Sequence, residues 1–310
     1  MRPDITVLMS VYNGERFIEG SIKSVLEQNF DRFELLVVDD RSTDRTPQLV
    51  SKFNDPRIRM FRNDKNLGLY VNLNILLHKA RAPLIKLWSQ DDIMLRNCLQ
   101  RGQNFYLEHR DVGYFYTSCD WISEQDEILE PDQDSTPIIL KPSLADYYCF
   151  LHGNLSANIS NLFIPKRTFE LIGVFNEDYI SADFDFAVRA QRHCSIGRIP
   201  EVLIRLRQHK AQWSQSEGSI IYFLSEDIKT YEILRNRLVH EQGTLTNEEA
   251  RIVLTQKFAK LYFHAAVRHY MRGNIAYGND IIRQLRAYLP INSLATEWLL
   301  SLPLRFLKRK

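Results

Sequence analysis

The chain has 310 residues, of which 45% are hydrophobic and 25% charged, a composition typical of a globular protein with one large domain or a domain and an appendage. Lys and Arg (40) nearly balance Asp and Glu (38), and the net charge of +2 argues against a nucleic-acid partner. The four cysteines are far apart in the sequence, which argues against a zinc site and against a disulfide framework. No apolar run approaches the roughly 18 residues that cross a bilayer, and no leader precedes the first strand-like segment. We therefore expect a cytoplasmic protein.

Residues 1–100 alternate strand-like and helix-like segments. The patterns predict strands at 5–11, 33–38, 57–61 and 84–87, and helices at 15–28, after Asp44, and at 67–80. This rhythm predicts an α/β fold with a doubly wound, mostly parallel sheet, in which a ligand lies beyond the carboxyl ends of the strands. Polar clusters at 10–13, 39–40 and 89–92 follow three of these strands and mark that edge.

The rhythm changes after residue 100. Strands are predicted at 112–117, 121–122, 161–164 and 202–207, helices at 166–172 and 184–193, and a polar loop at 124–142. From about residue 219 the pattern is helical, with a capping box at Thr246 and Glu249. We therefore predict an α/β domain over 1–215 and a C-terminal helical region over 216–310.

Asp39 and Asp40 end an apolar strand, where two adjacent carboxylates are costly unless something uses them. One of them could accept the imide N–H of a uracil ring, and Tyr12, after the neighbouring strand, offers a face for stacking. Alternatively, Asp39 caps a turn and Asp40 is simply exposed. Residue chemistry leaves both interpretations open.

Ser89, Gln90, Asp91 and Asp92 follow another buried strand. Carboxylates at a strand end are hard oxygen ligands that suit Mg²⁺ or Mn²⁺, and such an ion would neutralise a departing diphosphate. The alternative is that Asp92 only interacts with the dipole of a helix that starts near Leu95.

Asp183 and Asp185 open a predicted helix, and His209 follows a predicted strand. Carboxylates at a helix start are usually caps, but a sugar transferase needs one carboxylate to accept the proton of the acceptor hydroxyl. His209 is either a further metal or diphosphate ligand or an ordinary surface residue. Arg205 and Arg207 could pair with phosphate, although alternating basic residues on a strand usually form a solvated face.

The motifs together resemble those of the family 2 glycosyltransferases, which have the GT-A nucleotide-diphospho-sugar transferase fold. Eight segments match in order over about residues 4–215: 7–13, 24–28, 34–44, 66–68, 91–93, 163–166, 173–176 and 182–189. Three positions depart from the family pattern. Arg41 replaces the usual Gly, Ser89 replaces the first Asp of the metal motif, and Ala182 replaces the Glu before the base.

The resemblance implies roles for the matched positions. Tyr12 would lie against the base, and Asp183 would be the catalytic base of a single displacement that inverts the anomeric centre. The positions implied to contact the nucleotide-sugar are Ser10, Tyr12, Asn13, Glu15, Asp40, Gln90 and Asp91. The positions implied to hold Mn²⁺ or Mg²⁺ are Asp91, Asp92 and His209.

We therefore expect an inverting, metal-dependent transferase that moves a sugar from a UDP-sugar to an acceptor hydroxyl, in the assembly of a bacterial surface glycan. The acceptor would be a glycan or a lipid-linked sugar. A dTDP- or GDP-sugar donor is an alternative, because uracil and thymine share the imide edge that Asp40 would contact. A second alternative is a module that binds a nucleotide-sugar without catalysis, because Ser89 and Ala182 replace acidic residues of the family pattern.

Residues 298–310 combine large apolar groups with a basic cluster. This composition suits contact with an anionic membrane surface. The alternatives are a terminal helix packed on the protein and a homodimer contact, and the interruption by Pro303 favours packing.

Overall fold

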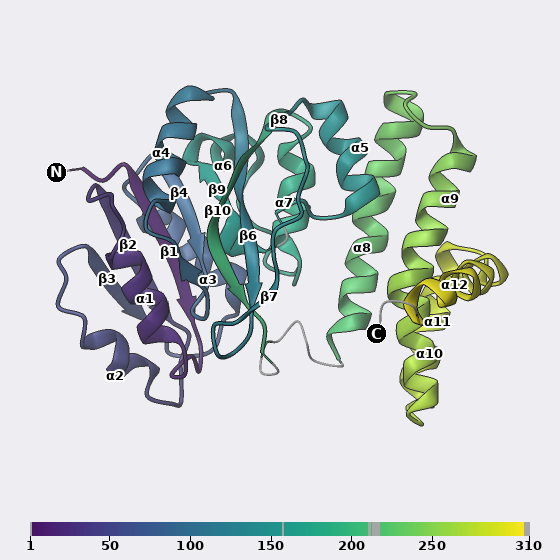
Figure 1. Cartoon of the computed structure of the whole chain (residues 1–310), viewed down its shortest axis with the longest axis horizontal. Helices are drawn as coiled ribbons and strands as arrows, with labels where there is room; N and C mark the ends of the chain where they lie inside the picture. Colours follow the sequence, from purple (N-terminus) through teal and green to yellow (C-terminus); the bar gives the residue numbers. More distant parts are fainter. Residues whose placement is uncertain (1, 157, 210–211, 213–217, 307–310) are drawn as a thin grey trace. The chain divides into compact units, whose positions relative to one another are not determined.

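The computed structural model describes residues 2–156, 158–209, 212 and 218–306. The chain divides into two compact units, which Figure 1 labels by element. The α/β unit comprises Met1–Ala145 and Asn154–His209, and the helical unit comprises Asp146–Gly153 and Lys210–Lys310.

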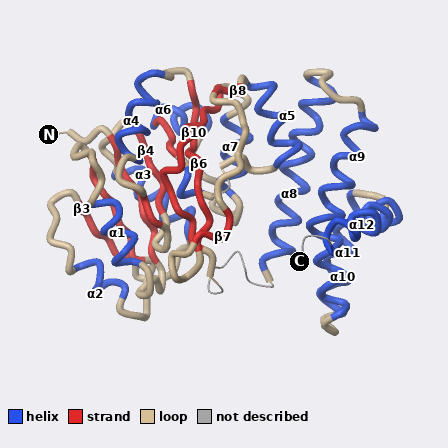
Figure 2. Tube along the Cα trace, in the orientation of Figure 1, coloured by secondary structure: helices blue, strands red, loops and turns tan. Residues whose placement is uncertain are grey.

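One sheet of ten strands forms the centre of the α/β unit. The strands are β1 Ile5–Val11, β2 Phe33–Asp39, β3 Ile58–Arg62, β4 Leu84–Trp88, β5 Ile93–Met94, β6 Val112–Ile122, β7 Ile128–Glu130, β8 Ile139–Leu140, β9 Phe163–Pro165 and β10 Ser195–Arg207. The helices are α1 Ile18–Leu26, α2 Thr46–Ser51, α3 Leu69–Lys79, α4 Cys98–Glu108, α6 Lys166–Ile172, α7 Ala182–Ala190 and the 3₁₀ helix η1 Ile159–Asn161, and α5 Pro142–His152 is shared with the helical unit. Figure 2 shows the strands in red with helices beside them.

The strand order is β3-β2-β1-β4-β9-β6-β10-β5, with β7 paired to β6 and β8 to β10. Parallel pairing joins β3, β2, β1 and β4, and also β6 and β10, whereas β9, β5, β7 and β8 pair antiparallel. Every residue of β2 and β4 is buried, as expected for parallel strands covered on both faces. The predicted α/β class with a mostly parallel sheet is therefore confirmed.

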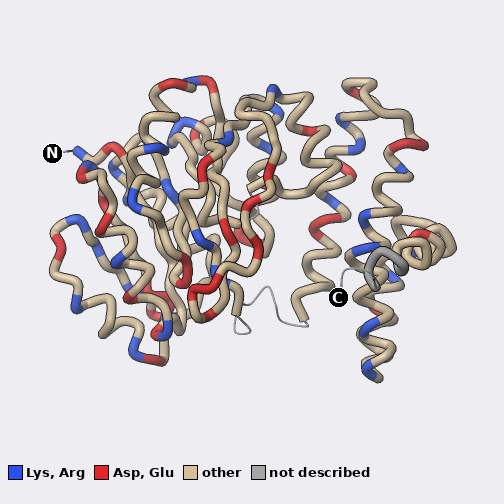
Figure 3. The backbone as a smooth tube through the Cα atoms, in the orientation of Figure 1, with Lys and Arg blue, Asp and Glu red and all other residues tan. Residues whose placement is uncertain are grey.

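Pairing register brings the predicted polar clusters to one edge. Val11 pairs with Asp39, and Met9 pairs with Trp88, so residues 12–15, 40–44 and 89–92 leave the sheet at the same end. Figure 3 shows acidic positions gathered at that end of the strands.

Several elements differ from their predicted bounds. The two strands predicted at 112–117 and 121–122 are one strand, β6, and β10 begins at Ser195 instead of residue 202. The predicted loop at 124–142 contains the short strands β7 and β8, and α5 was not predicted. Strand pairing in this region joins residues that are distant in sequence, such as Ile139 with Gly197, and a local pattern does not record such pairs.

The helical unit contains α8 Ser219–Asn236, α9 Asn247–Phe258, α10 His264–Met271, α11 Ile275–Tyr288 and α12 Ile291–Phe306, with π-helical turns η3 Arg237–Glu241 and η4 Ala259–Phe263. Its core includes Phe150, Tyr231 and Phe258, and the ring of Tyr231 contacts both phenylalanine rings. The predicted capping box at Thr246 and Glu249 is present, with both hydrogen bonds formed.

The C-terminal segment predicted for membrane contact or packing is described only as far as Phe306, and residues 307–310 lie outside the described part of the chain. Trp298 of α12 packs against Phe263 and donates its indole N–H to Nδ1 of His264, at 3.2 Å. No described helix combines the length and the apolar character needed to cross a membrane.

Candidate active site

The loop after β1 is fastened to the loop after β2 through consecutive backbone N–H groups. Asn13 N donates to Ser42 Oγ (3.0 Å), and Gly14 N donates to Thr46 Oγ1 (2.8 Å). Asn13 adopts a left-handed φ of 48°, a conformation that Asn tolerates better than most residues. The loop that carries the predicted contact residues Tyr12, Asn13 and Glu15 is therefore held in place by hydrogen bonds. Ser10, the last but one residue of β1, pairs with Val38.

Glu15 belongs to the same loop. Its backbone N–H donates to Asp44 Oδ2 (3.0 Å), and its carboxylate accepts from the N–H and the Nε of Arg45 (both 3.1 Å). Burial acts to raise the pKa of Asp44, but hydrogen bonds from Thr46 and from Glu15 outweigh it and hold that pKa below its usual value. Glu15 is thus engaged in shaping the loop.

Gln90 joins the carboxyl ends of β4 and β1. Its Oε1 accepts from Tyr12 N at 2.9 Å, and its Nε2 donates to Tyr12 O at 3.1 Å. A Cβ on Gly14 would lie 2.4 Å from that Oε1, so only glycine leaves room for the amide. Tyr12 itself remains 45% exposed at this edge.

Asp39 and Asp40 are both buried; the alternative is confirmed for Asp39, which caps the turn that follows it, and is wrong for Asp40, which is not exposed. Asp39 accepts from Ser42 N (3.2 Å) and forms an ion pair with Arg62 (3.0 Å). Asp40 accepts from the backbone N–H groups of Leu67 and Gly68 and from Asn63 Nδ2, at 2.8–2.9 Å. Because a carboxylate offers about four acceptor positions, these three bonds leave Asp40 about one.

Asp91 and His209 are brought together from positions 118 residues apart. Asp91 Oδ2 and His209 Nε2 are 2.9 Å apart, and both side chains are largely buried. The His209 ring also contacts Phe17, at 5.1 Å between centroids. Two of the three predicted metal ligands therefore meet.

Arg207 is buried beside Asp91 and is not part of a solvated face. It is 5% exposed, its Nε donates to Asp91 O (2.8 Å), and its Nη1 donates to Ser123 O (2.8 Å). It also forms an ion pair with Asp126. These contacts explain a basic residue on a buried strand without any phosphate.

Asp92, the third predicted ligand, points into the protein. It is 2% exposed, its Oδ2 accepts from Ser160 Oγ (2.6 Å), and its Oδ1 accepts from Arg207 N (2.9 Å). Burial, and then the charge of Asp91, raises its pKa above the ordinary value. The alternative role at a helix start is wrong, because residues 93–94 form β5 and α4 begins only at Cys98.

Asp183 lies in the first turn of α7 and keeps some exposed surface. Its Oδ1 accepts from Tyr70 OH at 2.7 Å, and its Oδ2 accepts from Asn154 Nδ2 at 2.8 Å. Burial raises the pKa of Asp183, although the bonds from Tyr70 and Asn154 act in the opposite direction. The carboxyl is thereby oriented and made a stronger base than an exposed aspartate.

Asp185 lies two residues further on and has a different environment. It forms an ion pair with Arg189 at 2.8 Å, and Arg189 also donates to the carbonyl oxygens of Ile172 and Val174. This set secures the turn at Gly173, whose φ is 84°. Asp185 is a structural residue of α7.

The described residues of segment 154–161 contact both Asp183 and Asp92. Asn154 contacts Asp183 and accepts from Ser156 Oγ (2.9 Å), and Ser156 O accepts from Asn161 (2.7 Å). Ser160 donates to Asp92. Tyr70 and Asn154 were missed from the sequence, because a lone Tyr or Asn carries no motif and their contacts with Asp183 span 113 and 29 residues.

The pair Asp91 and His209 fits a divalent cation of the Mn²⁺ type, which accepts carboxylate oxygen and imidazole nitrogen. Neighbouring ligands of an octahedral ion at about 2.1 Å lie about 3.0 Å apart, close to the observed 2.9 Å. Among the described residues no group of three or more His, Cys, Asp or Glu forms a metal cluster. Further ligands would come from a diphosphate or water.

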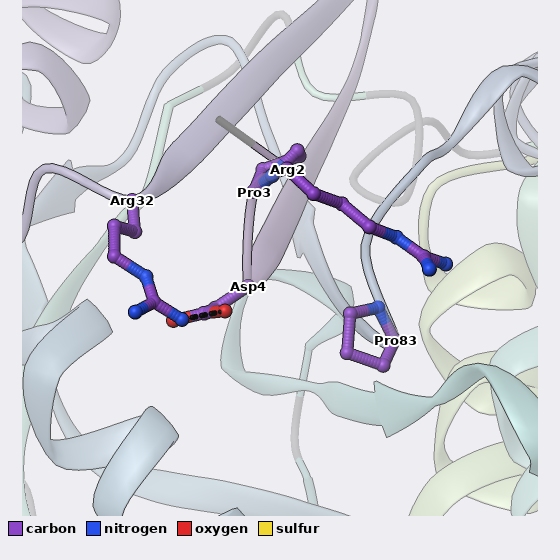
Figure 4. A pocket seen from close by; sticks show the side chains of 5 residues that line it. All are labelled: Arg2, Pro3, Asp4, Arg32 and Pro83. Atoms are coloured by element: carbon purple, nitrogen blue, oxygen red, sulfur yellow. Dashed lines mark hydrogen bonds and ion pairs between the residues drawn. The ribbon is translucent and has the colours of Figure 1, made fainter.

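A hollow of about 370 Å³ lies at the opposite edge of the sheet, among Arg2, Pro3, Asp4, Arg32 and Pro83 (Figure 4). Three of these residues directly precede β1, β2 and β4, so the hollow is at the amino ends of the strands. Arg32 and Asp4 form an ion pair there. The hollow is separate from the site described above.

Residues 6–154 match the model of the family described as Glycosyl transferase family 2. An Escherichia coli protein named UDP-Glc:alpha-D-GlcNAc-diphosphoundecaprenol beta-1,3-glucosyltransferase WfgD is 33% identical over 67% of this chain and 83% of its own length. The Bacillus subtilis protein named putative teichuronic acid biosynthesis glycosyltransferase TuaG is 25% identical over 76% of this chain and 82% of its own. Matches to two Rickettsia proteins cover 65% of their length.

The fold is similar to that of two solved glycosyltransferases. Staphylococcus aureus TarS 1–349 with UDP-GlcNAc has a TM-score of 0.67 at 17% identity, covering 94% of this chain and 83% of that one. The mannosyltransferase PcManGT of Pyrobaculum calidifontis, in complex with GDP-Man and Mn²⁺, has a TM-score of 0.55 at 18% identity, covering 96% and 88%. The GT-A fold, the ordered motifs and the family match together establish that this chain belongs to family 2 of the glycosyltransferases.

Proposed function

We propose that this glycosyltransferase moves a sugar from a UDP-sugar to an acceptor hydroxyl with inversion, using Mn²⁺ or Mg²⁺ held by Asp91 and His209 and using Asp183 as the base. The observation that carries the proposal is the meeting of Asp91 Oδ2 and His209 Nε2 at the carboxyl edge of the sheet. The cation would neutralise the charge that grows on the departing diphosphate.

The donor half rests on the loops after β1, β2 and β4. Tyr12 offers an exposed ring for the base, and Asp40 keeps about one acceptor position for an imide N–H. WfgD, as named, uses UDP-Glc, which supports a uridine donor. The GDP-Man bound by PcManGT keeps a GDP-sugar as the second candidate.

The acceptor half rests on Asp183. Its carboxylate would accept the proton of the acceptor hydroxyl while that oxygen bonds to the anomeric carbon and the carbon–oxygen bond to the diphosphate breaks. Tyr70 and Asn154 hold the carboxylate in place, so its orientation does not have to be gained during the reaction. One carboxylate suffices, because the diphosphate leaves without a proton.

The names of WfgD and TuaG, with a diphosphoundecaprenol-linked acceptor and teichuronic acid, support a role in cell-surface glycan assembly. We propose a glycan or lipid-linked acceptor on that basis, and a cytoplasmic location where nucleotide-sugars are available. Segment 154–156, beside Asp183, is where acceptor contacts are expected.

Paired substitutions of the adjacent aspartates test the metal proposal. Asp91→Asn should abolish Mn²⁺-dependent release of UDP from UDP-sugars, as should EDTA, because a neutral amide is a poor ligand. Asp92→Asn should retain most of the release, because its buried partners Ser160 and Arg207 can bond to an amide. The readout is UDP released with and without Mn²⁺.

Equal losses in the two variants, or release that EDTA leaves unchanged, would count against Asp91 as the metal ligand. If UDP binds but no sugar is released or transferred from any donor tested, the chain is a non-catalytic binding module. Calorimetry with UDP and Mn²⁺ separates these outcomes.

A further inference from the structure

The turn between α10 and α11 exposes apolar and basic side chains together. We call Arg268, Tyr270, Met271, Arg272 and Ile275 the α10–α11 turn surface. Met271 is 83% exposed and Ile275 is 61% exposed, and both arginines are exposed. Figure 1 shows this turn at one end of the helical unit.

The turn is held in one shape by contacts within the unit. Tyr270 OH donates to Asn279 Oδ1 at 2.8 Å, and the Tyr270 ring lies so close to Gly278 that a Cβ there would be 2.8 Å from it. Gly273 has a φ of 81°, which favours glycine and ends α10. Met271 and Ile275 are therefore presented outward by a fixed backbone.

The charge around this surface has one sign. Residues 258–279 contain three cations, Lys260, Arg268 and Arg272, and no Asp or Glu, and the flanking acidic residues Glu248 and Asp280 are paired with Arg251 and Arg283. Figure 3 shows this as blue without red at the turn. A partner that covers it should be anionic at its surface and apolar beneath.

We propose that the α10–α11 turn surface docks on an anionic phospholipid membrane, with Met271 and Ile275 entering the acyl boundary and Arg268 and Arg272 at the lipid phosphates. Segments that bind at the surface of an anionic membrane combine exposed apolar side chains with Lys or Arg in this way. A second copy of the chain is a poorer occupant, because two-fold pairing would bring the same arginines together. The proposal does not depend on the sugar-transfer reaction.

Cosedimentation of the full chain with vesicles tests the proposal. Binding is expected to vesicles of equal parts phosphatidylcholine and phosphatidylglycerol and not to pure phosphatidylcholine, and added salt should weaken it because it screens the arginines. Arg268→Gln with Arg272→Gln should weaken binding about 30-fold, from two lost contacts with the anionic surface. Met271→Ser with Ile275→Ser should weaken it roughly tenfold or more.

Matched controls lie on the α/β unit. Leu107→Ser with Leu171→Ser removes two exposed apolar groups (49% and 57%), and Lys23→Gln with Lys52→Gln removes two exposed cations. Neither pair should change vesicle binding. Melting temperatures and UDP binding should be the same in all variants, which excludes misfolding as the cause.

Three results would overturn the proposal. The first is no binding of the parent chain to the anionic vesicles. The second is unchanged binding by Met271→Ser with Ile275→Ser while removal of residues 302–310 abolishes it, which would assign the contact to the chain end. The third is a dimer that this double variant converts to a monomer without any effect on vesicles.

Discussion

At the scale of single residues, the environment of Asp183 decides its chemistry. Both carboxylate oxygens accept a hydrogen bond, and the neighbouring carboxylate of Asp185 is neutralised by Arg189. Two aspartates in the first turn of the same helix therefore have different environments.

We expect Asp183→Asn to lower the rate of sugar transfer about 10²- to 10⁴-fold, the usual contribution of a general base, with UDP affinity near that of the parent. Asp185→Asn is the matched control and should retain transfer, with a lower melting temperature from the lost ion pair to Arg189. Single-turnover transfer rates and UDP titrations provide the measurements. Full transfer by Asp183→Asn would remove the base assignment.

Tyr70→Phe should change the pH dependence of transfer. The Tyr70 hydroxyl stabilises the charged form of Asp183, so its removal should raise further a pKa that burial already raises. Because the base must be ionised, activity falls as the pH falls through that pKa, and the acid limb should move to higher pH in the variant. The plateau at alkaline pH should change little. A rate that falls equally at all pH values would indicate a merely structural role for Tyr70.

At the scale of elements, the ends of β1 and β4 are joined by one side chain, Gln90, in space that Gly14 leaves open. Gly14→Ala should destabilise the protein by about 1–2 kcal/mol, the cost of two displaced hydrogen bonds. In a Gln90→Ala background the same change should cost almost nothing, so the double-mutant cycle in urea should give a coupling of about 1–2 kcal/mol, equal to the cost of Gly14→Ala alone. Additive losses would mean that Gly14 is required for another reason.

At the scale of the whole molecule, the chain path crosses from one unit to the other within α5. Residues 146–153 belong to the helical unit, where Asp146 forms a buried ion pair with Arg237 (3.2 Å) and Phe150 contacts Tyr231. The predicted boundary near residue 215 stays a prediction, but a cut there would separate these partners.

A fragment of residues 1–215 should therefore melt at a lower temperature than the full chain, or without cooperativity, and should bind a hydrophobic dye. Its α5 would leave Phe150 exposed and Asp146 without Arg237. A chain ending at Phe306 serves as the control and should melt like the parent. A fragment that melts as cooperatively as the full chain would mean that α5 does not need the helical unit.

The order of strands and helices over residues 1–100 could be predicted from the sequence, because the hydrophobic periods of buried parallel strands and amphipathic helices are local properties. The strand-end positions of Asp40, Gln90 and Asp91 followed from the same pattern. The bounds of β6 and β10 and the existence of α5 could not be predicted, since their stability comes from distant partners.

The sequence by itself determined the fold class, the family motifs and the edge of the sheet at which polar groups gather. Only the tertiary structure decided which acidic group faces which partner. Asp91 meets His209, 118 residues away, while Asp92, the next residue, turns inward to Ser160, 68 residues away, so each direction is set by a partner that is distant in sequence. The contacts of Tyr70 and Asn154 with Asp183 also join residues that are distant in sequence. Such contacts depend on tertiary packing, which no local sequence pattern records.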